Sequence, residues 1–249
     1  MTSISEDDVQ HYLEHGYCIL EKALTADEVD MLHGEADELA NYVTSEGFDL
    51  LHDFGGILEP LECGFLDAPT ADERDYKTDL IAYIKRRDSL TPDVAQFMTS
   101  KLARWAGPLL YGSVEQNSPL YLLNEQYIIK PPKTKSLSTF QWHRDSDYYQ
   151  DAKCRKEPTI ACWIALDDVD EHNGTLYLGT MADKHSEAHG HHVVNIPAGS
   201  IVFMNCRLWH KSLGNESSLF RRAFMPQFCK RPVIDPDTNL PVAMAIPFE

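Results

Sequence analysis

The sequence has few basic residues for its length. Lys and Arg number 22 against 39 Asp and Glu in 249 residues, which gives a formal net charge of −17. Such a field repels the phosphate backbone of nucleic acids and anionic membrane surfaces. The composition therefore argues against both partners and leaves room only for a local basic pocket that binds a small anion.

The sequence also lacks long apolar runs and paired cysteines. No stretch approaches the roughly 18 apolar residues that a membrane-spanning helix needs. The start, MTSISEDDVQ, is acidic and polar, unlike a secretory signal or a transit peptide. The six cysteines are scattered without a CxxC pair, as in proteins with reduced thiols. We expect a cytoplasmic protein, and the sequence does not decide between a monomer and a homodimer.

No linker rich in Pro, Gly or Ser divides the chain, so residues 1–249 are expected to form a single domain. Its first 110 residues have mainly helical periodicity. Ser5 is a suitable cap for a short helix, and Thr25 with Glu28 forms a capping box for a longer one. Thr91-Pro92 is expected to open a third, with proline at the tolerated first position.

The pattern changes from about Leu120 to short runs of β-forming residues between turn residues. We expect eight strands, at 121–130, 139–145, 159–166, 175–179, 191–196, 200–205, 207–213 and 220–228. Short strands after a helical front half predict an α+β fold, with a small barrel or sandwich core over 120–229 buttressed by the N-terminal helices. Residues 230–249, with four prolines, are expected to wrap irregularly around it.

One expected strand carries a candidate metal-binding pair. In QWHRDSDYYQ, residues 141–150, alternation of side chains places His143 and Asp145 on one face and Arg144 on the other. A single His-x-Asp is a weak signal, since the same pattern occurs on charged surface strands.

A second segment supplies a third ligand. A hairpin turning at Asn215-Glu216 would place His210 opposite Arg221, with Ser212 on the same side of the sheet. An imidazole beside a guanidinium suits a metal-chelating carboxylate, because the planar fork of arginine binds carboxylates bidentately. Two histidines and one carboxylate form the facial triad of non-haem Fe(II) sites, which leaves positions open for a 2-oxo acid and O2.

Together these motifs resemble the phytanoyl-CoA dioxygenase family of Fe(II)- and 2-oxoglutarate-dependent oxygenases. The resemblance spans about residues 4–230 and is most specific at HRD (143–145), CWIALDD (162–168) with NG (173–174), and H-x-S…R (210–221), with KPP (130–132) also typical. It implies a double-stranded β-helix, or jelly-roll, core with N-terminal helices. It also implies that O2 is consumed and that one 2-oxoglutarate is decarboxylated to succinate per turnover.

The resemblance also implies roles for individual residues. His143, Asp145 and His210 would hold the iron and carry the catalytic chemistry. Arg221 would bind the distal carboxylate of 2-oxoglutarate with help from Ser212. Looser matches place three further residues around the co-substrate: Gln126, Lys130 and Trp163.

The chain departs from the family at two places, which affect the analogy of substrate more than that of chemistry. Arg144 stands where glutamine is common, and LGTMADKH, with His185, replaces the usual proline-glycine-serine-histidine turn. A histidine cluster follows, which is either a second metal site or, as its irregular spacing favours, an exposed loop: His185, His189, His191 and His192. The residues after the metal pair are the expected place of substrate contact: Asp147, Tyr148 and Tyr149.

We expect an oxygenase that oxidises, most simply by hydroxylation, an unactivated C–H bond of a small organic molecule. Desaturation, epoxidation and ring formation need the same metal ligands and stay open, whereas the carboxylate of Asp145 argues against halogenation. Two alternatives from other classes also stay open: a metal-binding cupin-like barrel without oxygenase activity, and a protein-modifying hydroxylase.

Overall fold

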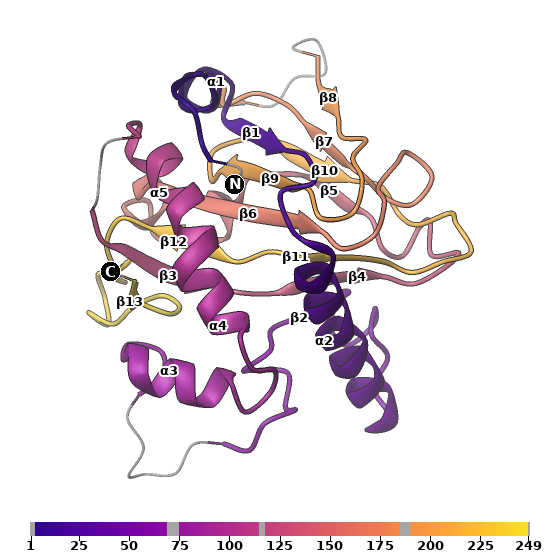
Figure 1. Cartoon of the computed structure of the whole chain (residues 1–249). Helices are drawn as coiled ribbons and strands as arrows, with labels where there is room; N and C mark the ends of the chain where they lie inside the picture. Colours follow the sequence, from indigo (N-terminus) through magenta and orange to yellow (C-terminus); the bar gives the residue numbers. More distant parts are fainter. Residues whose placement is uncertain (1–2, 69–74, 115–117, 185–189, 249) are drawn as a thin grey trace.

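Two antiparallel sheets form the core of the molecule, and helices cover the outer face of the larger one (Figure 1). The computed structural model describes residues 3–68, 75–114, 118–184 and 190–248. The larger sheet has nine strands and the smaller has four. This confirms the predicted α+β double-stranded β-helix fold with N-terminal helices.

The larger sheet is built from both ends of the chain. Its main path is β13 (Ile246–Phe248), β3 (Leu120–Asn124), β12 (Gln227–Cys229), β6 (Thr159–Ala165), β11 (Arg221–Phe224), β4 (Tyr127–Lys130) and β2 (Ile57–Leu58). In addition β9 (Ile201–Asn205) pairs with β6, and β1 (Tyr17–Leu20) pairs with β9. Among the described residues of the tail, β13 adds an edge strand, so the tail is not entirely the irregular wrap that was expected.

The smaller sheet has the order β5 (Phe140–His143), β10 (His210–Ser212), β7 (Leu176–Leu178) and β8 (His192–Val193). A 3-10 turn, Asp145–Tyr148, follows β5, and a second, Cys154–Lys156, precedes β6. The smaller sheet faces the larger one, and both meet at the functional site.

The helices are α1 (Glu6–His15), α2 (Ala26–Ser45), α3 (Leu80–Arg87), α4 (Val94–Phe97) and α5 (Ala103–Tyr111). The predicted cap at Ser5 and the predicted capping box of Thr25 with Glu28 are both present, and Ser5 also forms a capping box with Asp8. The third predicted helix begins later than expected, at Val94, because Asp93 before it has a left-handed backbone with φ 74°. A π-helical turn, Met98–Leu102, joins α4 to α5.

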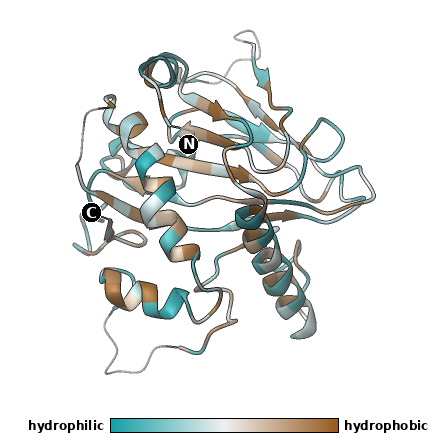
Figure 2. Ribbon diagram, viewed as in Figure 1, coloured by the Kyte–Doolittle hydropathy of each residue, from teal (hydrophilic) through white to brown (hydrophobic). Residues whose placement is uncertain are grey.

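The strand side chains divide the interior into two cores, one on each face of the larger sheet. In β6, Ile160, Cys162 and Ile164 pack under the helices, whereas Ala161, Trp163 and Ala165 pack between the sheets. This division follows from the alternation of side chains along a strand buried on both faces. The brown apolar segments of β6 and of the helices show the first of these layers (Figure 2).

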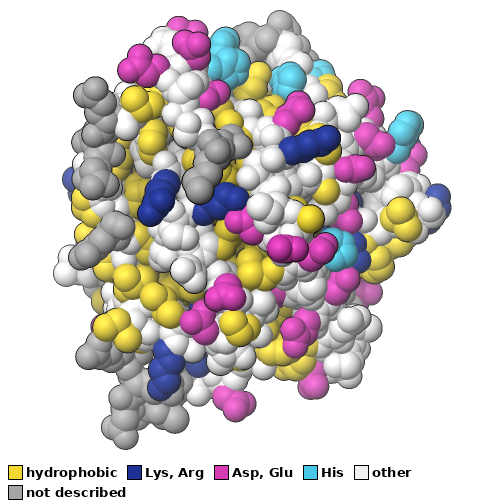
Figure 3. Space-filling model, in the orientation of Figure 1, with side chains coloured by type: hydrophobic (Ala, Val, Ile, Leu, Met, Phe, Trp, Pro, Cys, Tyr) yellow, Lys and Arg dark blue, Asp and Glu magenta, His cyan; other side chains and the backbone are white. Residues whose placement is uncertain are grey.

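Acidic side chains are spread over the surface in Figure 3, and basic ones are few, as the net charge of −17 requires. In the part of the chain that the structure describes, no helix combines the length and apolar character that crossing a membrane would need.

Several predicted strand boundaries were wrong. Residues 121–130 form two strands, β3 and β4, and residues 220–228 form β11 and β12 with a break at Met225-Pro226. Proline has no N–H to donate to a sheet, which explains the second break. The strand expected over 139–145 ends at His143, and Asp145 opens the 3-10 turn.

Candidate metal centre

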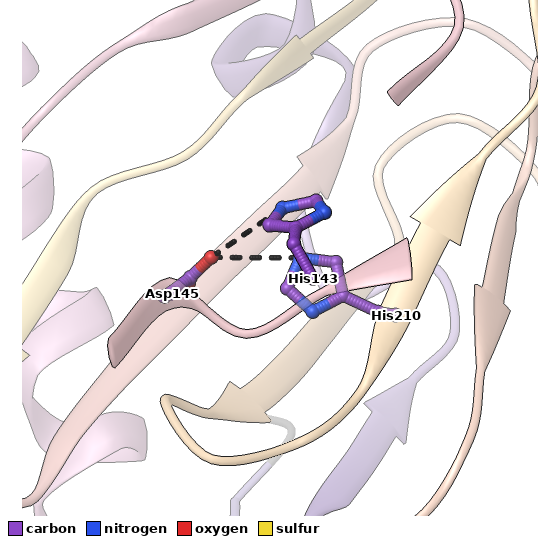
Figure 4. Close-up of side chains that lie close together, drawn as sticks. All are labelled: His143, Asp145 and His210. Atoms are coloured by element: carbon purple, nitrogen blue, oxygen red, sulfur yellow. Dashed lines mark ion pairs between the residues drawn. The ribbon is translucent and has the colours of Figure 1, made fainter. Parts of the chain in front are cut away.

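His143, Asp145 and His210 lie together at the end of the smaller sheet, with their side chains pointing toward one another (Figure 4). Asp145 Oδ1 is 3.9 Å from His143 Nε2 and 3.5 Å from His210 Nε2. The three ligand atoms all lie within 4.8 Å of one another, so the side chains converge on one position that a metal ion could occupy. His143 and His210 are directly opposed across β5 and β10.

Hydrogen bonds orient each of the three side chains. His143 Nδ1 is 2.7 Å from the carbonyl of Gln141, and His210 Nδ1 is 3.0 Å from that of Leu208. A carbonyl only accepts, so each Nδ1 carries the proton and each Nε2 presents its lone pair to the metal position. Gln227 Nε2 donates to Asp145 Oδ2 at 3.1 Å, which leaves Oδ1 for a metal.

The surroundings favour the neutral, ligating form of His143. Burial, and after it the nearby His210, lower the pKa of His143 below its usual value. Metals bind the deprotonated imidazole, so this shift favours coordination. The donor set of two imidazoles and one carboxylate oxygen suits a non-haem Fe(II) centre.

A cavity of about 340 Å³ opens over the three residues. Its size is at the low end for small-molecule sites. Among its lining residues are Gln126, Tyr148, Tyr149, Trp163, Ser212, Arg221 and Gln227.

Arg221 and Lys130 form a pair of buried basic residues, with Arg221 in the cavity lining and Lys130 behind it. They are register partners on β11 and β4, and each side chain is fully buried. Arg221 donates to the carbonyls of Gly174 (3.2 Å) and Ile128 (3.5 Å), and its Nε has no partner. In the described part of the chain, neither cation forms an ion pair with a carboxylate.

Burial strongly disfavours the charged forms of both side chains. Burial lowers the pKa of Arg221 to about 9. Burial and then the charge of Arg221 lower the pKa of Lys130 to about 5. A buried charge without a counter-charge is strongly unfavourable, so an anion bound here would be favoured by both groups.

The other residues predicted around the co-substrate lie nearby, in different positions. Lys130 does not line the cavity itself; its ammonium donates to Ser212 Oγ at 2.7 Å and to the carbonyl of Leu213. Trp163 packs between the sheets with its ring 5.4 Å from the Arg221 guanidinium carbon. Gln126 lines the cavity beyond the start of β4.

Of the residues predicted to contact substrate, the structure brings two to the cavity. Tyr148 and Tyr149 line it, and the Tyr148 ring meets that of His143 edge-on at 5.6 Å. Asp147 does not line it, because its carboxylate pairs with Arg144 at 2.8 Å. Arg144 itself packs on Trp209, away from the triad.

In the histidine cluster, His185 and His189 lie outside the described residues. The ring of His192 stacks on that of Tyr17 at 5.6 Å, and that of His191 lies 5.2 Å from Tyr177.

The predicted hairpin between His210 and Arg221 was wrong. β10 pairs with β5 and β7 in the smaller sheet, whereas β11 pairs with β4 and β6 in the larger one. The connection crosses between the sheets because the buried Asn215 side chain donates to the carbonyls of Lys130 and Leu219. His210 and Arg221 therefore face the cavity from opposite sheets.

Sequence reasoning missed Gln227, Glu59 and Asn124, which all line the cavity. Pro226 was a signal for Gln227, since a strand break there changes which residues turn inward. Glu59 follows β2, a two-residue strand without a distinctive pattern. Its place at the site depends on long-range pairing of β2 with β4.

Known structures share this fold at low identity. AviO1 from Streptomyces viridochromogenes Tue57 is 20% identical with a TM-score of 0.61, over 98% of this chain and 99% of that one. The α-ketoglutarate-dependent epimerase SnoN from nogalamycin biosynthesis is 16% identical with a TM-score of 0.62, over 91% and 83%. EvdO2 from Micromonospora carbonacea var. aurantiaca, complexed with 2-oxoglutarate, is 18% identical with a TM-score of 0.58, over 91% of each chain.

No curated protein sequence matches the chain. The family model of phytanoyl-CoA dioxygenase, however, matches residues 12–223, which is most of the chain and includes the triad and Arg221. The chain belongs to the phytanoyl-CoA dioxygenase family and is an enzyme of the Fe(II)- and 2-oxoglutarate-dependent oxygenases.

Proposed function

We propose that the enzyme oxidises a C–H bond of a small organic molecule, most simply by hydroxylation, at a site where His143, Asp145 and His210 hold Fe(II). Arg221 binds the distal carboxylate of 2-oxoglutarate, Ser212 adds a hydroxyl to it, and Lys130 lies behind Ser212, where a bound anion favours its protonated form.

The observation that carries this proposal is the meeting of two features in one cavity. The triad lies on the smaller sheet and the buried basic pair, Arg221 and Lys130, lies on the larger one, on opposite sides of the same cavity. An elongated dianion with a chelating end and a carboxylate end fits this arrangement. A metal-binding barrel without a co-substrate gives no reason to bury an arginine that has no carboxylate partner beside a lysine.

Bound Fe(II), with 2-oxoglutarate and O2, supplies the oxidising power and releases succinate and CO2. The chain provides the positioning. His143, Asp145 and His210 would hold the ion from one side, and three protein ligands would leave positions for 2-oxoglutarate and O2. Trp163, Phe140 and Leu176 give that cavity apolar walls, which exclude water from the reaction.

Hydroxylation is the simplest outcome for this donor set. SnoN, which has a similar fold, is an epimerase, so the fold alone does not fix the outcome. The small cavity supports a small-molecule substrate over a peptide, which would need a long open groove.

Arg221 and its neighbour Arg222 provide a matched test. Arg222 points to the other face and pairs with Asp37 at 2.7 Å and with Asp167 at 3.4 Å. Fe(II) and 2-oxoglutarate should give the weak visible charge-transfer band of the chelate under argon. Arg221→Met should weaken 2-oxoglutarate binding by about a hundredfold, because a buried charge pair loses one partner. Arg222→Met should leave it within a few fold.

Three results would speak against the proposal. One is the absence of the band in wild-type protein that has bound iron. Another is equal 2-oxoglutarate affinity in both variants. The third is a failure to form succinate from 2-oxoglutarate in air with any member of a small-molecule library.

A further inference from the structure

Glu59 brings a carboxylate to the cavity wall at a distance from the buried cations. It follows β2, whose Leu58 is paired with Tyr127 of β4, whereas Arg221 is paired with Lys130. Glu59 is thus level with Gln126, four residues along β4 from Lys130. Strands rise about 3.3 Å per residue, so roughly 13 Å of sheet separates the two ends.

The groups around Glu59 are amides and apolar side chains. Asn124 and Gln126 line the same part of the cavity with Ile57 and Leu123. A hydrogen bond from the Asn124 side chain favours the charged carboxylate, although burial acts against it more strongly and raises the pKa of Glu59. Asn124 is also the register partner of Gln227, which holds Asp145. This end of the cavity is therefore close to the metal ligands.

Glu59 is not matched by a cation in the cavity. Arg221 is the one lysine or arginine among the described residues that line it, and it lies at the other end. Lys77, whose charge reaches Glu59, pairs instead with Glu62 at 3.1 Å. A half-buried carboxylate between amides calls for a positively charged donor, just as the buried cations call for an anion.

We propose that Glu59 selects a substrate that carries a basic amine, whose ammonium pairs with this carboxylate while the C–H bond to be oxidised lies over the triad. This inference rests on the proposed function for the orientation of the cavity. It excludes substrates that present a carboxylate or phosphate at this end, acyl-CoA thioesters included, because like charges would meet in a site shielded from water.

Three probes of one shape test the proposal: cyclohexylamine, cyclohexanol and cyclohexanecarboxylate. Their affinities are measured by calorimetry on the full chain with Fe(II) and 2-oxoglutarate under argon, at about pH 8, where the amine is protonated. The variant is Glu59→Gln, which keeps the shape and removes the charge. The matched control is Glu21→Gln, since Glu21 is an exposed acid outside the cavity lining and is not among the charges that act on Glu59.

The wild-type protein should bind the amine best and the carboxylate least. Glu59→Gln should lower the affinity for the amine about tenfold, raise that for the carboxylate, and change that for the alcohol by less than about twofold. Glu21→Gln should leave this order unchanged.

The inference is overturned if Glu59→Gln and wild type bind the amine with equal affinity, or if the control variant loses as much affinity for the amine as Glu59→Gln does. It is also overturned if wild type binds the alcohol or the carboxylate more tightly than the amine. The charge-transfer band is recorded for each protein before the probes are added. Its absence in wild type would count against the proposed function, whereas its presence without a preference for the amine would count against the role of Glu59 alone.

Discussion

Arg87 and Arg221 are both fully buried, and they differ in the charges around them. Arg87 lies between two carboxylates: its Nη1 donates to Glu35 at 2.8 Å, and its Nε is 3.1 Å from both oxygens of Glu125. Tyr127 and Tyr83 add hydroxyl donors to these two acids. Arg221 donates hydrogen bonds to two backbone carbonyls, and its neighbour is Lys130 instead of an acid.

The difference shows what each arginine is for. We call the Arg87 cluster closed because its one arginine, two acids and two tyrosines form hydrogen bonds with one another. The cluster joins α2 and α3 to residues 125–127 at the start of β4. The Arg221–Lys130 pair is open, because its charges lack a counter-ion in the described chain. Removing one partner from a closed buried cluster lowers the stability of the fold. An open cluster is itself unfavourable for stability, and a bound ligand of opposite charge offsets this cost.

The largest expected effect comes from opening the closed cluster. Arg87→Met leaves Glu35 and Glu125 buried without a cation, and the free energy of unfolding should fall by about 3–5 kcal/mol. Urea denaturation measures this. The exposed neighbour in Lys85→Ala is the control, with an expected change within about 0.5 kcal/mol. A similar small change in Arg87→Met would show that the cluster does not stabilise the fold.

Arg221→Met should behave in the opposite way. It removes a buried charge that has no counter-ion, so the unfolding free energy of the ligand-free protein should fall by no more than about 1 kcal/mol, or rise. Stabilisation by added 2-oxoglutarate, which follows from mass action, should be lost in the same variant. Thermal denaturation with and without the ligand measures both. A loss of stability like that of Arg87→Met would place the two arginines in one class.

Gln227 tests whether a hydrogen bond from a neutral side chain keeps Asp145 oriented toward the proposed metal site. Gln227→Leu removes the hydrogen bond to Asp145, and Fe(II) affinity should fall by about tenfold, the lower end for residues that orient metal ligands. Anaerobic metal titration measures it. The exposed Gln150, substituted likewise by leucine, should leave the affinity unchanged. If both variants bind iron as wild type does, Asp145 needs no such support.

A further prediction concerns pH. The pKa of Lys130 is lowered to about 5 by burial and by Arg221, below the value of about 10.4 in an unfolded chain. The unfolded chain therefore holds more protons between these values. Compared with Lys130→Met, the ligand-free wild type should gain stability as pH rises across this window, on the order of 1 kcal/mol per pH unit, and lose it as pH falls toward 5. Urea denaturation at pH 6, 7 and 8 tests this, and parallel curves would contradict it.

Local patterns were the part of the structure that the sequence predicted well. The caps at Ser5 and Thr25 need only neighbours three residues away, and the structure has both. His143 and Asp145 were placed together by alternation, which survives because Arg144 between them is still extended (φ −121°, ψ 142°) although the strand has ended. His210 was identified from a hairpin that would pair it with Arg221, and although that pairing was wrong, the resemblance to the family pointed to the same histidine.

What the sequence did not predict depends on contacts between distant segments. The Arg87 cluster joins residues from 35 to 127, and no local pattern links them. The sheet to which β11 belongs is decided by Asn215 and the loop it contacts, since a turn-rich segment suits a hairpin and a crossover equally well. Glu59 reaches the cavity through the pairing of β2 with β4.

The crossing between β10 and β11 has a mechanical consequence. His143 and His210 belong to one sheet and Arg221 belongs to the other, so a molecule that contacts both the proposed metal site and Arg221 spans the gap between the sheets. Such a molecule connects the two sheets when it is bound. Side chains packed between the two sheets, such as Leu176 and Trp163, set the spacing of the sheets. This spacing determines the length of a molecule that can contact both.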